Sequence, residues 1–164
     1  RDARCRCLWT ICVLERVSSR VTRIDFYVVT DTDPEARLLV AARLTDKALG
    51  QSHRLFIHTN DKHHAEQLDD LLWAFKPASF VPHRCCSATT EDNQANEPVL
   101  IGWQQEPKYH DDVLINLTRT APAFFSRFQR VIEIVTQDSE DLTALREAWR
   151  FYRDRGYPLT KYDL

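Results

Sequence analysis

The sequence predicts an α/β fold with a single domain, in which a mainly parallel sheet carries helices on both faces. Segments rich in β-branched and aromatic residues alternate with segments of helical periodicity, a pattern typical of parallel sheets. The length of 164 residues fits one such domain and allows a substantial buried core. The chain has only three glycines, so the glycine-rich loops that bind phosphate in many of these folds are absent.

Residues 1–20 are expected to be an N-terminal extension, either disordered or translated from a mis-set start, and residues 21–164 to form the domain. Five of the 22 basic residues and two of the 24 acidic residues lie in the extension, which leaves the domain with a net charge of −5. The apolar run over 8–14 is short for a signal peptide, and no small-residue cleavage site follows it.

The first strand and the first helix are predicted over residues 24–30 and 34–49. The strand segment (IDFYVVT) consists largely of β-branched and aromatic residues. Asp33 suits an N-cap, Pro34 suits the first helical position, and Gly50 is expected to end the helix.

The second strand (HRLFIH) is predicted over residues 53–58. Asn60 or Asp61 then caps a second helix that extends to about Phe75. A long connection without predicted secondary structure follows over 76–97.

The rest of the domain is predicted to hold three more strands, a short helix and a final long helix. The strands are expected over 98–103, 113–117 and 130–135, and the short helix over 122–128. Asp138 or Ser139 caps the final helix, which extends to about Arg155 and is stopped by Gly156 and Pro158.

The cysteines indicate a reducing compartment. Three of the five lie in the extension, and Cys85 and Cys86 are adjacent, a spacing that rarely satisfies disulfide geometry. We therefore expect free thiols and a cytoplasmic protein. No stretch approaches the roughly 18 apolar residues of a membrane span, so no membrane partner is expected.

The turn after the first strand argues against a nucleotide-dependent enzyme, which is the alternative function for such a fold. A phosphate would lie there on backbone N–H groups that glycines expose. Residues 30–33 (TDTD) contain no glycine, and their two carboxylates repel phosphate. A divalent cation could use Asp31 and Asp33, but Asp33 is better explained as a helix cap.

No other motif predicts catalysis or a bound metal, and we expect no catalytic residue and no cofactor. His58, His63 and His64 are close in sequence, but adjacent helical residues point about 100° apart, and the H-E-x-x-H pattern of zinc sites is absent. A nucleophile motif of the G-x-S-x-G type is also absent.

Trp73 is a candidate partner-binding residue because it lies off the apolar face of the second predicted helix. Tryptophan is enriched among the residues that dominate protein interfaces. Phe80 follows on a segment that Pro77 and Pro82 stiffen. The alternative is that this segment folds back over Trp73, and spacing alone favours neither interpretation.

The final helix carries a basic ridge, formed by Arg146, Arg150 and Arg153, which borders its apolar face. Trp149 lies at the boundary between the ridge and that face. Arginines offer forked donors to carboxylates, so the pattern suits an acidic peptide, especially one with a terminal carboxylate. A solvated arginine face with pairs to Glu147 or Asp154 explains the same pattern.

Several segments resemble the chi subunit family of bacterial DNA polymerase III, a family of clamp-loader accessory proteins. The resemblance covers about Val21 to the C-terminus. Its most specific part is AEQLDDLLWAFKPASFVPH over 65–83, and it continues through PVLIGW over 98–103, DDVLINL over 111–117 and REAWRFYRDRGYPL over 146–159.

The resemblance implies a Rossmann-like fold without a nucleotide site and a bridging role without catalysis. It implies that the psi subunit binds at Trp73 and Phe80 and tethers the protein to the clamp loader. It further implies that the acidic C-terminal tail of single-stranded DNA-binding protein binds at the final helix. The residues expected at that tail site are Arg146, Trp149, Arg150, Arg153 and, at the end of the preceding strand, Val135.

The expected function is therefore that of a non-catalytic accessory subunit of the replicative polymerase. It would link the clamp loader, indirectly through psi, to single-stranded DNA-binding protein during replication. Contact with DNA is expected to be mostly indirect, because the domain is acidic overall and only the ridge is locally basic.

Overall fold

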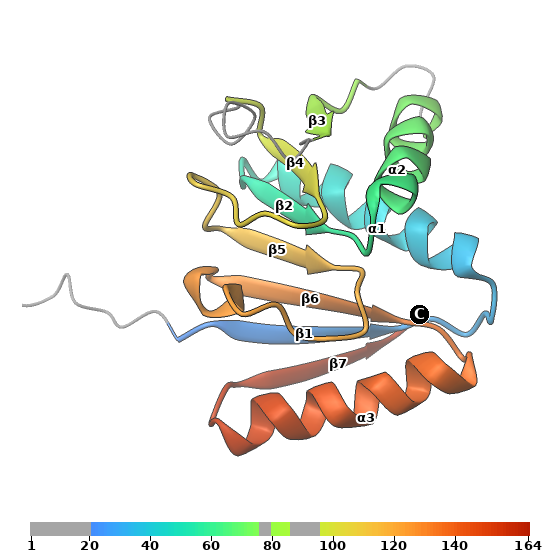
Figure 1. Ribbon diagram of the computed structural model, residues 1–164, viewed down its shortest axis with the longest axis vertical. Coiled ribbons are helices and arrows are strands. Elements are labelled where there is room, and N and C mark those ends of the chain that lie inside the picture. Colours follow the sequence, from blue (N-terminus) through green and yellow to red (C-terminus); the bar gives the residue numbers. More distant parts are fainter. Residues whose placement is uncertain (1–20, 76–79, 86–95) are drawn as a thin grey trace, which may run out of the picture.

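The computed structural model describes residues 21–75, 80–85 and 96–164. Within them the core is a wholly parallel, seven-stranded sheet with the strand order β3-β4-β2-β5-β6-β1-β7 (Figure 1). The strands are β1 (Arg23–Val28), β2 (Leu55–His58), β3 (His83–Cys85), β4 (Val99–Gly102), β5 (Val113–Asn116), β6 (Arg130–Val135) and β7 (Leu159–Asp163). The predicted single-domain α/β fold is confirmed.

Helices cover both faces of the sheet, as the sequence predicts. The helices are α1 (Pro34–Gly50), α2 (Lys62–Ala74), α3 (Ser139–Asp154) and the short 3-10 helix η2 (Phe125–Arg127). Alternate residues of the inner strands enter two separate hydrophobic clusters, one beneath α1 and α2 and the other beneath α3 and η2. In β2, for example, Leu55 and Ile57 belong to the first cluster and Phe56 belongs to the second.

Aspartate side chains begin the three long helices and resolve the two capping alternatives. Asp33 accepts a hydrogen bond from the backbone N–H of Glu35 at 2.9 Å, and Asp61 accepts one from that of His64 at 2.8 Å. Asp138, rather than Ser139, caps α3. At the end of α1 the left-handed backbone conformation falls on Ser52, with φ of 60°, and not on Gly50.

Two edge strands were not predicted. β3 interrupts the connection expected over 76–97, and it is only three residues long. β7 follows directly after Pro158, and its residues LTKYD lack a strong apolar pattern. β7 nevertheless pairs with β1, in a register that begins at Ile24 and Leu159. Pro158 does not prevent this pairing, because a proline just before an edge strand removes no hydrogen bond from the ladder.

Candidate protein-interaction surfaces

The carboxyl edge of the sheet is where enzymes of this architecture bind their ligands. The N-termini of α1, α2 and α3 all lie at this edge, since each helix follows a parallel strand. Each of these N-termini carries an aspartate cap, formed by Asp33, Asp61 and Asp138. The exposed Asp31 carboxylate also accepts the backbone N–H of Asp33 at 3.0 Å. Carboxylates therefore occupy the donors that a phosphate would need.

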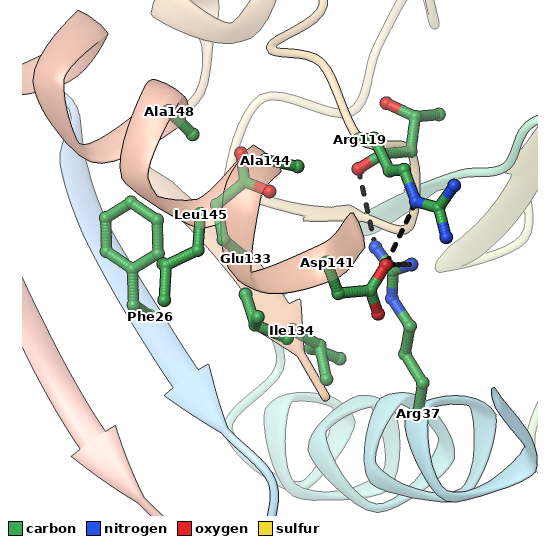
Figure 2. Close-up of a pocket in the computed structure, with 11 residues that line it drawn as sticks. Phe26, Arg37, Arg119, Glu133, Ile134, Asp141, Ala144, Leu145 and Ala148 are labelled. Carbon is green, nitrogen blue, oxygen red and sulfur yellow. Dashed lines mark hydrogen bonds and ion pairs between the residues drawn. The ribbon is translucent and has the colours of Figure 1, made fainter. Parts of the chain in front are cut away.

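A pocket at the same edge lies between α3 and β6 (Figure 2). Phe26, Leu145 and Ala148 form its apolar wall, and Arg37 and Arg119 line the opposite side. Both arginines are engaged by acidic groups of the chain. Arg119 donates to Asp141 at 3.0 Å and pairs with Glu140 and Asp138, and Arg37 lies 3.8 Å from Asp141.

The floor of this pocket holds a buried carboxylate that the sequence analysis missed. Glu133 of β6 accepts hydrogen bonds from the Tyr152 hydroxyl at 2.7 Å and from the Asn116 amide at 3.1 Å. Burial raises the pKa of Glu133 to about 7, although both hydrogen bonds oppose the shift. Burial and the adjacent carboxylate also raise the pKa of Tyr152. This hydrogen-bond network joins β5, β6 and α3. The sequence feature that could have indicated it is the single glutamate within the apolar run RVIEIV.

The histidines do not assemble into a metal centre in the part of the chain that the structure describes, which holds no suitable group of three His, Cys, Asp or Glu side chains. Burial lowers the pKa of His58, His64 and His110, which favours their neutral forms. No helix among the described residues is both long and apolar enough to span a membrane.

Trp73 and Phe80, which we call the aromatic pair, are both exposed. Trp73 leaves the α2 face that buries Leu68 and Leu72, and 59% of its surface is exposed. Phe80, just before β3, is 68% exposed, and the two ring centroids lie 5.3 Å apart. The segment before β3 does approach Trp73, as expected if it folded back over that residue. It does not cover Trp73, however, because the two rings form a joint apolar surface open to solvent.

The basic ridge of Arg146, Arg150 and Arg153 lies on the exposed side of α3. Arg153 donates to the neighbouring Asp154 at 3.0 Å. Arg146 and Arg150 form no hydrogen bond or ion pair within the described ranges, so their guanidinium groups are available to a partner.

Trp149 and Val135, the other two residues expected at this site, are placed differently from each other. Trp149 is half-buried, and its ring centroid lies 5.0 Å from that of Phe26 on β1. Val135 ends β6, is only 6% exposed, and lines the pocket of Figure 2 with Leu145. The structure therefore brings Trp149 to the edge of the ridge and leaves Val135 beneath α3.

The aromatic pair and the basic ridge lie at opposite ends of the sheet (Figure 1). The pair belongs to α2 and to the segment before β3, which is one edge strand. The ridge belongs to α3, which packs against β6 and β7 on the other face, and β7 is the other edge strand. A protein bound to one surface therefore leaves the other surface accessible.

Comparison with known proteins identifies strong relatives. The model of the family described as DNA polymerase III chi subunit, HolC, matches residues 21–160. DNA polymerase III subunit chi of Pseudomonas aeruginosa is 43% identical over 144 residues, which cover 88% of this chain and 98% of the relative. The corresponding subunit of Escherichia coli is 32% identical over 107 residues, covering 65% of this chain and 71% of its own.

Solved structures share the fold at low sequence identity. T4 UvsW is similar with a TM-score of 0.64 and 8% identity, over 87% of this chain and 41% of that protein. The structure of S. cerevisiae Dbp5 bound to RNA and ADP BeF3 is similar with a TM-score of 0.60 and 13% identity, over 88% of this chain and 42% of that one. At these identities the likeness concerns the fold alone.

Proposed function

Because the chain belongs to the chi subunit family of DNA polymerase III, a family of replication accessory subunits rather than catalytic ones, we propose that it acts as a bridge with two binding surfaces. The aromatic pair binds psi, which connects the protein to the clamp loader. The basic ridge binds the acidic C-terminal tail of single-stranded DNA-binding protein. The site of action is the cytoplasm, where bacterial DNA is replicated.

The assignment of psi to the aromatic pair rests on exposure and chemistry. Trp73 and Phe80 are both more than half exposed, so a partner that covers them removes apolar surface from water. This burial contributes favourably to the free energy of binding. Aromatic side chains of this kind are the usual anchors of protein interfaces. Both lie within the segment 65–83 on which the resemblance to chi subunits is most specific.

The assignment of the tail to the ridge rests on charge and on Trp149. Arg146 and Arg150 have no acidic partner in the part of the chain that the structure describes, so binding a carboxylate there breaks no internal ion pair. Trp149 offers an apolar surface beside these cations, which suits the apolar end of a peptide that terminates in a carboxylate. Arg153 contributes charge at the far end of the ridge, beside Asp154.

The single observation that carries the bridge is the separation of the two surfaces at opposite ends and on opposite faces of one sheet. Both partners can then be held at the same time. Since many tails coat single-stranded DNA, a linked complex experiences a high effective concentration of tails. DNA itself is held mainly through the coating protein, because the domain carries a net charge of −5.

The test is the formation of a ternary complex. Calorimetric titration of the protein with a tail peptide is performed before and after saturation with psi. We expect one tail per protein, with the same affinity in both titrations to within about twofold. A tail that competes with psi, or that fails to bind at all at low salt, contradicts the bridge.

A further inference from the structure

A buried histidine lies directly beneath the exposed aromatic pair. The His83 side chain is only 1% exposed, and its ring centroid lies 5.2 Å from that of Trp73. Its Nδ1 atom is 2.7 Å from the carbonyl oxygen of Val81, and its Nε2 atom is 3.1 Å from the carboxylate of Asp69. The Val81 carbonyl therefore holds one side of the His83 ring, and Asp69 lies within ion-pair distance of the other side, where Nε2 forms no hydrogen bond.

These contacts join two elements that carry the aromatic pair. Asp69 and Trp73 are one turn apart on α2, so the ring of His83, from β3, packs against one helical turn. Its Nδ1 atom contacts Val81, which lies in the segment just before β3. Phe80 lies three residues before His83 on the segment that ends in β3. The position of His83 thus determines how the segment bearing Phe80 approaches Trp73.

An exposed aromatic pair needs such a support. Side chains that remain mobile in the free protein must be ordered when a partner binds, and this ordering weakens the affinity. Neither Trp73 nor Phe80 is held by burial, since each is more than half exposed. A rigid group beneath the pair removes part of that cost before binding.

We propose that His83, held by the Val81 carbonyl and by Asp69, is the positioning residue of the psi-binding surface. His83 does not touch psi, because it is buried. It acts through Trp73, whose ring it supports, and through the segment that presents Phe80. The identity of the partner rests on the proposed function, but the positioning of Trp73 does not.

The test compares His83→Leu, which keeps the bulk and removes both nitrogens, with His63→Leu. His63 is exposed on the first turn of α2, which makes it a matched control. Affinity for psi and for the tail peptide is measured by calorimetry. The Trp73 environment is followed by ¹⁹F NMR with fluorotryptophan, and its signal is assigned with Trp73→Phe.

We expect His83→Leu to weaken psi binding about tenfold, because Trp73 and Phe80 would then have to be ordered when psi binds. The affinity for the tail peptide should be unchanged. The Trp73 signal should shift or broaden. His63→Leu should change none of these quantities. Asp69→Asn, which preserves shape, should weaken psi binding about threefold, and it carries the test if His83→Leu does not fold.

The outcomes separate the inference from the proposed function. If Phe80→Ala weakens psi binding and His83→Leu does not, the inference is overturned and the proposed function stands. If Phe80→Ala has no effect on psi, the proposed function fails. The positioning of Trp73 by His83 is then still judged by the ¹⁹F signal, and an unchanged signal in a folded His83→Leu or Asp69→Asn protein overturns it.

Discussion

At the residue scale, Glu133 is a buried carboxylate whose environment opposes its charge. It is enclosed by the pocket between α3 and β6, and it receives donors from Tyr152 and Asn116. These hydrogen bonds do not offset the loss of water, and its pKa rises to about 7 from an ordinary value of 4.5. The folded protein therefore holds a proton between pH 4.5 and 7 that the unfolded chain releases.

This proton makes stability depend on pH in a definite direction. The free energy of unfolding is highest below pH 4.5 as far as this group is concerned, and it falls as the pH rises toward 7. Between pH 5 and pH 8 the loss due to Glu133 amounts to about 2–3 kcal/mol. Glu133→Gln should remove this loss and flatten the profile, as measured by denaturant unfolding at several pH values.

The control for this prediction is Glu147→Gln, which makes the same chemical change at an exposed glutamate of α3. Its pH profile should match that of the wild type. A Glu133→Gln profile as steep as the wild-type profile contradicts a buried proton at this site.

Arg150 is the second residue whose role can be measured alone. Arg150→Ala should weaken the binding of the tail peptide by about 1–3 kcal/mol, the range for a charge-assisted hydrogen bond. Binding should weaken further as salt is added, since the ridge is exposed. Arg43→Ala, an exposed arginine of α1 on the other face, should leave tail binding unchanged. Equal affinities of Arg150→Ala and the wild type at low salt contradict the ridge as the tail site.

At the element scale, the sequence predicted most elements because their signals are local. The aspartate caps and the apolar segments identified the three long helices and β1, β2, β4, β5 and β6, with bounds shifted by one or two residues. β3 and β7 were missed because they are edge strands that are stabilised by pairing with β4 and β1. Glu133 and His83 were missed for the same reason, since their partners come from elsewhere in the chain.

The start of α3 offers a prediction that distinguishes the two caps allowed by the sequence. Asp138 accepts the backbone N–H groups of Glu140 at 3.0 Å and of Asp141 at 3.4 Å. Asp138→Ala should therefore lower the free energy of unfolding by about 1 kcal/mol. Ser139→Ala should change it by less than about 0.5 kcal/mol, because an exposed first-turn serine makes no cap. A larger effect at Ser139, measured by denaturant unfolding, contradicts this placement of the cap.

At the scale of the whole molecule, the parallel sheet separates the two proposed surfaces. α2 and β3 are held at one edge by one hydrophobic cluster, and α3 is held near the other edge by the second cluster. The residues of the two surfaces could be chosen from helical periodicity and from the family resemblance. Their separation in space could not, because it depends on the strand order.

This separation predicts that one substitution abolishes one interaction only. Phe80→Ala should weaken psi binding by about 2 kcal/mol or more, as expected when an aromatic anchor of an interface is truncated. The tail peptide should bind with unchanged affinity, since α3 packs on the opposite face of the sheet. Because 68% of the Phe80 surface is exposed, the midpoint of thermal unfolding should barely change. Two titrations on the folded variant, with psi and with the tail peptide, measure both affinities. If both fall together the two surfaces are not independent, whereas a variant that unfolds means that Phe80 stabilises the domain rather than a complex.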